Sequence, residues 1–275
     1  MNLNDIKNID KTHKSTDKMP VLFVGHGSPM NAIEENEFSA GWRKQGETLP
    51  KPSMILCVSA HWETDGTFVT AVPKPETIHD FYGFPKELFA VQYPAPGNPG
   101  MAKEISDEIK STDVGLDEKW GLDHGAWSVI KHMYPNAGVP VVQFSIDRRK
   151  GPNYHYELAK ELSFLRRKGV LIVGSGNMIH NLRVIAWNKM NESEYGYDWA
   201  HEADFKLKNI INGGDFKELV NYSKQGGEMK MAVPTPEHFI PLLYTLGLKE
   251  ETDQLSWFND KLVLGSISMA SLLIG

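Results

Sequence analysis

The sequence predicts an α/β fold, in which a single domain has a central mixed, largely parallel sheet flanked by helices. Short apolar segments alternate along the chain with amphipathic helical segments, as in α/β proteins. Several apolar segments contain almost no polar residue, which is typical of strands covered on both faces. The chain has 275 residues, of which 41% are hydrophobic, so it is long and apolar enough for one such core.

The expected strands begin at residue 21 and continue to the C-terminus. Each is a run of apolar residues bounded by glycine, proline or polar residues. The predicted strands are 21–24 (VLFV), 53–60 (SMILCVSA), 139–146 (VPVVQFSI), 170–174 (VLIVG) and the pair 261–265 (KLVLG) and 266–274 (SISMASLLI).

Helices are expected between these strands. Asn98 and Pro99 are a favourable N-cap and first-turn residue for a helix, and Gly169 after basic residues is a typical helix end. The predicted helices are 98–110, 125–135, 153–169, 198–213, 215–224 and 235–247.

Charge and cysteine content restrict the partners and the compartment. The first 18 residues are polar and predict an N-terminal extension to a single domain of residues 19–275. The net charge of −6 argues against a nucleic-acid partner, and the apolar C-terminal segment is too short to span a bilayer. Cys57, the only cysteine, lies in an apolar run and predicts no disulfide. We therefore expect a soluble, cytoplasmic protein without a membrane partner.

Three apolar segments lead into a histidine. The segment VLFVG is followed directly by His26, SMILCVSA is followed directly by His61, and VLIVGSGN is followed after a short turn by His180. Side chains beyond the carboxyl ends of parallel strands meet at one edge of the sheet. A fourth residue, His238, follows Pro234 at a predicted helix start and can point to the same edge.

Each of these histidines has an ordinary structural alternative, as a turn residue, a core residue or a first-turn helix residue. Their recurrence favours a shared transition-metal site, because neutral imidazole binds zinc, iron, copper and nickel. His124 in GLDHGAW and His79 in TIHDFYGFP are candidates for acid–base chemistry outside the metal. The remaining histidines, 13, 132, 155 and 201, are expected on the surface.

Eight motifs, in order, resemble the 4,5-DOPA extradiol dioxygenase family of the class III (LigB-like) extradiol ring-cleaving dioxygenases. The resemblance runs from about Met19 to the C-terminus. The motifs are GHGSPMNAIEEN, SAHW, TIHDFYGFP, YPAPGNP, DHGAW, VVQFSID, GSGNMIHNLR and PTPEHFIPLLY.

The resemblance implies that His26, His61, His180 and His238 hold one transition metal per chain. The wider class binds its metal through two histidines and a glutamate, so Glu237 beside His238 is either an alternative ligand or a partner that orients an imidazole. It implies zinc in the isolated protein and Fe(II) for activity, since zinc has no redox chemistry.

The resemblance also implies opening of a catechol such as DOPA by O₂ to a muconic semialdehyde. A base and an acid are required, and His124 and His180 are the candidates. In the narrower family His180 is a fourth ligand, whereas in the wider class its counterpart is a base. Two alternatives stay open: a zinc-dependent hydrolase with Glu237 as base, and a metal-binding protein without turnover.

Overall fold

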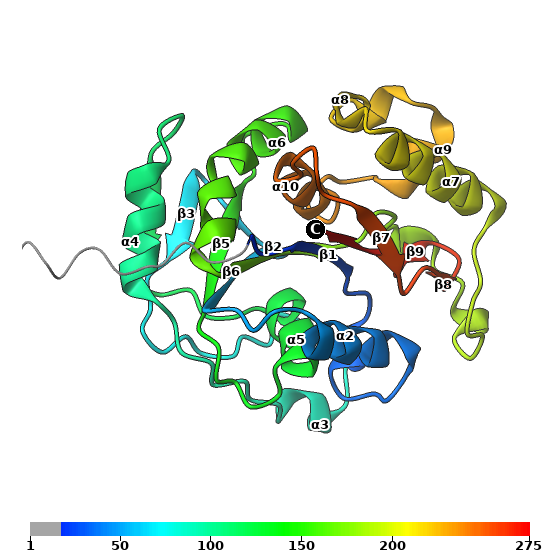
Figure 1. The fold of residues 1–275 in the computed structure, drawn as a ribbon. Helices are drawn as coiled ribbons and strands as arrows, with labels where there is room; N and C mark the ends of the chain where they lie inside the picture. The colour runs from blue at the N-terminus through cyan, green and yellow to red at the C-terminus, as the bar shows by residue number, and fades with distance from the viewer. Residues whose placement is uncertain (1–17) are drawn as a thin grey trace, which may run out of the picture.

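A central eight-stranded sheet lies between two layers of helices (Figure 1). The computed structural model describes residues 18–275, so residues 1–17 of the predicted extension, with His13, lie outside the described residues. The strand order is β4-β3-β5-β2-β6-β1-β10-β7. This arrangement confirms the predicted α/β fold with a mixed sheet.

The four central strands β5, β2, β6 and β1 pair in parallel. Strands β10, β7 and β3 join them in antiparallel pairs, and β4 pairs with β3 in parallel. The strands are β1 (Val21–Gly25), β2 (Met54–Thr64), β3 (Thr67–Thr70), β4 (Val114–Asp117), β5 (Val141–Asp147), β6 (Val170–Gly176), β7 (Leu255–Phe258), β10 (Ser271–Ile274) and a separate pair, β8 (Leu262–Val263) and β9 (Ile267–Ser268).

Helices α2, α3 and α5 lie on one side of the sheet in Figure 1, and α6 to α10 lie on the other. The helices are α2 (Glu37–Thr48), α3 (Lys86–Phe89), α4 (Pro99–Glu108), α5 (His124–Met133), α6 (Pro152–Glu161), α7 (Asp198–Gly213), α8 (Phe216–Leu219), α9 (Gly227–Ala232) and α10 (Ile240–Gly247). Among residues 18–275 no helix has both the length and the apolar character needed to cross a membrane.

The predicted helix boundaries are correct where a cap is encoded locally. The Asn98 side chain accepts a hydrogen bond from the Met101 amide at the start of α4, as its N-cap role requires. The helix predicted from residue 153 ends earlier than expected, at Glu161, and a 3₁₀ turn continues to Lys168. The last helix begins at Ile240 rather than at residue 235, so the histidine of the TPEH motif precedes it.

Two histidines that were predicted on the surface are buried, so that prediction was wrong. The ring of His132 contacts the Asn31 carbonyl oxygen at 2.8 Å, and the ring of His155 lies 3.1 Å from the Tyr244 hydroxyl. Both residues lie on the core-facing sides of their helices. His201 on α7 is exposed, as expected.

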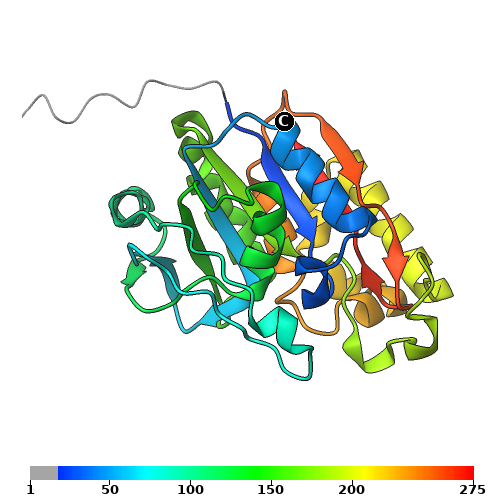
Figure 2. The same ribbon diagram turned by 90° about the horizontal axis from the view of Figure 1, so that it is seen from below.

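The carboxyl ends of the parallel strands meet at one edge of the sheet. In Figure 2 the blue arrow of β1 points to this edge, at the bottom of the view, where the segments around α3 and after β6 also lie. Polar functional side chains commonly lie at such an edge of a parallel sheet, because the loops that follow the strands lie outside the hydrophobic core. The histidines of interest are found there.

Candidate active site

Five imidazole rings converge at the carboxyl edge of the sheet. The ring of His26 lies 5.0 Å from that of His61 and 5.3 Å from that of His238, measured between centroids. The His124 ring is 3.9 Å from the His61 ring, and the His180 ring stacks on the His238 ring at 3.5 Å. The structure therefore brings together the four predicted ligands, which include the acid–base candidate His180, and a further acid–base candidate, His124.

The local placement of His61 differs from the prediction. The sequence predicted it just beyond a strand end, but β2 continues through it to Thr64. The pairing of β2 with β5 shifts register between Val58 and Glu63, and His61 lies in this irregular stretch. A bulge of this kind redirects a side chain without ending the strand. The outcome for the site is the same, because the His61 ring reaches the cluster.

The Nε2 atoms of His26 and His61 lie 3.2 Å apart. Two nitrogens bound to one tetrahedral ion at 2.1 Å would be about 3.4 Å apart. Candidate ligand atoms fall into two groups in which all atoms lie within 4.8 Å: His26 with His61 and His124, and His180 with Glu237 and His238. Contact of the His238 ring with both His26 and His61 joins the groups.

Two glycines allow the histidine loops to approach closely. Gly27, directly after His26, has φ of +60°, a conformation that side chains other than glycine rarely adopt. A Cβ atom on Gly125 would lie 2.5 Å from the Ser59 hydroxyl and 2.9 Å from His61 Cδ2. The glycines that follow the histidines of GHG and DHG are therefore required by the packing of the site itself.

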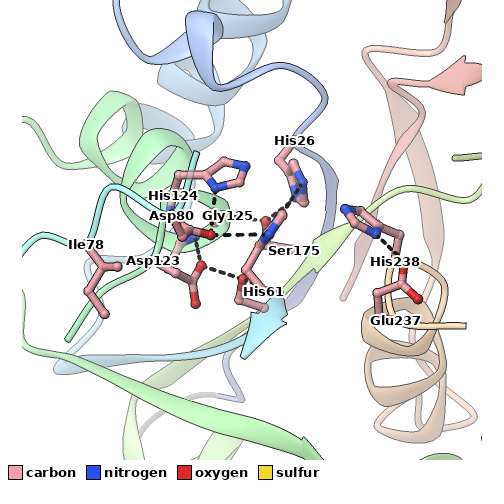
Figure 3. Close-up of polar contacts among 12 residues, drawn as sticks. His26, His61, Ile78, Asp80, Asp123, His124, Gly125, Ser175, Glu237 and His238 are labelled. Carbon is pink, nitrogen blue, oxygen red and sulfur yellow. Dashed lines mark hydrogen bonds and ion pairs between the residues drawn. The ribbon is translucent and has the colours of Figure 1, made fainter. Parts of the chain in front are cut away.

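Further polar groups hold the rings in place (Figure 3). The Ser175 hydroxyl lies 3.1 Å from His26 Nδ1 and donates to the Gly125 carbonyl oxygen at 2.5 Å. Glu237 Oε1 lies 3.1 Å from His238 Nδ1, so its carboxylate contacts the ring edge that Nε2 does not occupy. Glu237 was expected either to bind the metal or to orient an imidazole, and this contact corresponds to the orienting role.

Burial disfavours the charged form of the four predicted metal ligands. It is the main cause that lowers the pKa of His26 and His238 well below the usual value, and that lowers the pKa of His61 to about 3 and of His180 to about 4. A neutral imidazole is the form that binds a metal ion. Nitrogen donors that are neutral and convergent fit one transition-metal ion.

The sequence missed two acidic residues that support the cluster. The Asp80 carboxylate contacts the rings of both His124 and His61, at 2.9 and 3.3 Å. Asp123 is fully buried, caps α5 and accepts hydrogen bonds from Ser59 and Gln143, both at 2.6 Å. Asp80 follows a histidine in TIHD and Asp123 precedes one in DHG, which is a signal that could have been used.

His79, a predicted acid–base candidate, does not reach the cluster. Its Nε2 lies 3.0 Å from the Val91 carbonyl oxygen, and its ring packs against Phe81, Phe89 and Trp127. A ring nitrogen this close to a carbonyl oxygen is a hydrogen-bond donor, and it holds the loop between β3 and α3. The structure gives His79 a loop-forming role.

An aromatic wall extends from the cluster to the surface. The ring of Phe81 meets the His124 ring edge-on at 5.6 Å and contacts the rings of Phe84 and Phe89 at 5.4 and 5.0 Å. Next to it, Tyr82 is 91% exposed. Apolar rings that run from a polar centre to solvent are suited to receive a flat ligand ring.

Comparison with known proteins places the chain in a family. Residues 15–271 match the family model described as the catalytic LigB subunit of aromatic ring-opening dioxygenase. The 4,5-DOPA dioxygenase extradiol of Escherichia coli K12 is 44% identical over 266 residues, covering 95% of this chain and 96% of the relative. The protein of the same name from Beta vulgaris is 36% identical, covering 91% and 96%.

A solved structure agrees with this result. The crystal structure of an uncharacterized protein from Escherichia coli K12 superimposes with a TM-score of 0.80 and 39% sequence identity. The match covers 94% of this chain and 100% of that chain. Since both the family model and the relatives span nearly the whole sequence, the resemblance carried by the eight motifs is confirmed, and the chain belongs to the LigB family of aromatic ring-opening dioxygenases.

Proposed function

We propose that this protein is a metal-dependent extradiol dioxygenase that opens a catechol such as DOPA with O₂ to a muconic semialdehyde. The convergence of five imidazoles beside an aromatic wall carries the proposal. The names of the relatives support DOPA as a test substrate. In the reaction the ring bond next to the two hydroxyl-bearing carbons breaks, and both oxygen atoms of O₂ enter the product.

The proposed metal ligands are His26, His61 and His238, with His180 at or near the metal. The first two have Nε2 atoms in ligand-like proximity, and the third lies about equally far from both rings. When bound, a redox-active ion such as Fe(II) would orient the catechol and transfer electrons to O₂, whereas closed-shell zinc could orient a catechol but has no redox chemistry. We therefore propose zinc as the ion of the isolated protein and Fe(II) as that of the active one.

His124 and His180 adjoin different proposed ligands. The His124 ring adjoins that of His61, and the His180 ring covers that of His238. His180 is neutral and can accept the catechol proton, and His124 with its aspartate partner can hold or return a proton.

Phe81→Ala is expected to raise the KM for a catechol by about 2- to 10-fold while kcat changes little. The reason is that one aromatic ring pair contributes about 0.5–1.5 kcal/mol, and the substrate ring would lose its partner. Initial-rate kinetics over a range of DOPA concentrations measures the effect. Phe205→Ala, on the exposed face of α7, is the matched control. A fall in kcat at unchanged KM would contradict a substrate-binding role for Phe81.

The function is tested with an oxygen electrode on iron-loaded and zinc-loaded protein. Iron-loaded protein is expected to consume one O₂ per catechol and to form a yellow semialdehyde, and zinc-loaded protein is expected to be far slower. Equal rates would count against electron transfer through the ion. Ester or amide hydrolysis by the zinc form without O₂ uptake would support the hydrolase alternative. Metal binding without either activity would support a protein without turnover.

A further inference from the structure

We propose that Asp80 is a positioning residue whose single carboxylate sets the tautomers and the mutual placement of His61 and His124. The inference rests on the proposed function, in which His61 is a metal ligand and His124 transfers a proton. Asp80 lies in the loop before α3, far in sequence from His124, so the fold rather than a local turn creates the contact.

The contacts involve both oxygens of the carboxylate. Asp80 Oδ1 accepts a hydrogen bond from the backbone amide of His124 at 2.8 Å. Oδ2 lies 2.9 Å from His124 Nδ1 and 3.3 Å from His61 Nδ1. The close-up in Figure 3 shows the aspartate between the two rings. One side chain thus fixes the start of α5, the His124 ring and the His61 ring together.

This geometry dictates where the ring protons lie. An ionised carboxylate only accepts hydrogen bonds, so each imidazole facing it places its proton on Nδ1. In the neutral form of each ring, the Nε2 atom then carries a free lone pair. For His61 that atom faces His26 Nε2 at 3.2 Å, which is where a metal ion would be bound. A carboxylate behind a ligating histidine is a common way of fixing its tautomer.

The arrangement also couples two functions. The His61 and His124 rings are 3.9 Å apart and meet the same oxygen, so a shift of Asp80 moves a ligand and a proton-transfer residue at once. Ser175 and Glu237 hold His26 and His238 separately. Among the described residues Asp80 is the acidic side chain with contacts to two of the five imidazoles.

Asp80→Asn is the direct test, because the amide has the same shape but offers one acceptor and one donor. The backbone amide of His124 must meet the acceptor, so the NH₂ group faces both Nδ1 atoms and favours the Nε2–H tautomer of each ring. We expect the dissociation constant for Zn(II), measured by chelator competition, to rise about 10- to 100-fold. In the metal-free variant, histidine ¹⁵N chemical shifts are expected to change from the Nδ1–H to the Nε2–H pattern.

Asp117→Asn is the matched control. Its carboxylate accepts hydrogen bonds from the backbone amides of Lys119 and Trp120 in a neighbouring turn and contacts no imidazole of the cluster. It should leave zinc affinity and ring tautomers unchanged. Asp80→Glu keeps an acceptor-only group and is expected to keep the Nδ1–H tautomers. Zinc affinity of Asp80→Asn within about twofold of wild type, with unchanged tautomers, overturns the proposal.

The wild-type spectrum tests the proposal even where Asp80→Asn fails to fold. Metal-free wild-type protein must show His61 and His124 with the proton on Nδ1, and an Nε2–H tautomer of either ring overturns the inference. Zinc binding and ¹⁵N spectra require no turnover. The expected tautomers without O₂ uptake would contradict only the proposed function. Normal O₂ uptake with the opposite tautomers would contradict only the role of Asp80.

Discussion

His61→Gln is expected to abolish both metal binding and ring cleavage. In the structure His61 Nε2 lies 3.2 Å from His26 Nε2, and the Asp80 carboxylate supports its ring from behind. A glutamine amide is a much weaker ligand than imidazole and lacks the second ring nitrogen that Asp80 contacts. We expect metal content to fall from about one ion per chain to a small fraction of that.

Elemental analysis after loading with Zn(II) or Fe(II) measures this effect, with circular dichroism to confirm the fold. His26→Gln is expected to behave in the same way, because its ring provides the opposing nitrogen. His201→Gln is the control, since this exposed histidine on α7 lies outside the cluster. Full metal occupancy in His61→Gln would show that the ion binds elsewhere, and the assignment of ligands would have to be abandoned.

The sequence predicted much of this site because strand ends are encoded locally. The runs before His26, His61 and His180 are apolar enough to be recognised as central strands, and the residues after parallel strands lie at one edge of the sheet. Position along the chain therefore predicted that these three histidines lie close together, although His61 lies within β2 rather than after it. A helix after His124 was also predicted, although the N-cap role of Asp123 was not.

Other features depend on contacts that no local pattern describes. The role of Asp80 requires the loop before α3 to contact the start of α5, and this is a tertiary contact between segments far apart in the sequence. Strands β3 and β7 are only four residues long and lie toward the edges of the sheet, so they lack the long apolar run of a central strand. Burial of His132 and His155 likewise depends on tertiary packing. Their helices also carry other polar residues, so the local sequence does not indicate which polar side chains are buried.

The resting geometry of His180 supports a role that is separable from metal binding. Its ring stacks on the His238 ring with an interplanar angle of 12°, and its group of candidate ligand atoms does not include His26 or His61. It follows β6 by a short turn, and its backbone is held by a hydrogen bond to the Ala232 carbonyl oxygen and by a β-bridge to Ile267. Rotation of the side chain, rather than movement of the backbone, would change the distance from the ring to a bound catechol.

His180→Gln is therefore expected to keep most of its metal and to lose ring cleavage by about 10²- to 10⁴-fold, the range for removal of a general base or acid. A catalytic metal site with open positions typically has three protein ligands, and His26, His61 and His238 would supply them without His180. Burial lowers the pKa of His180 to about 4, so the ring is neutral before a substrate binds. Metal analysis and O₂ uptake, measured beside His61→Gln, separate the two roles. Metal loss as complete as in His61→Gln would make His180 a plain ligand, whereas retained metal with lost turnover identifies the base.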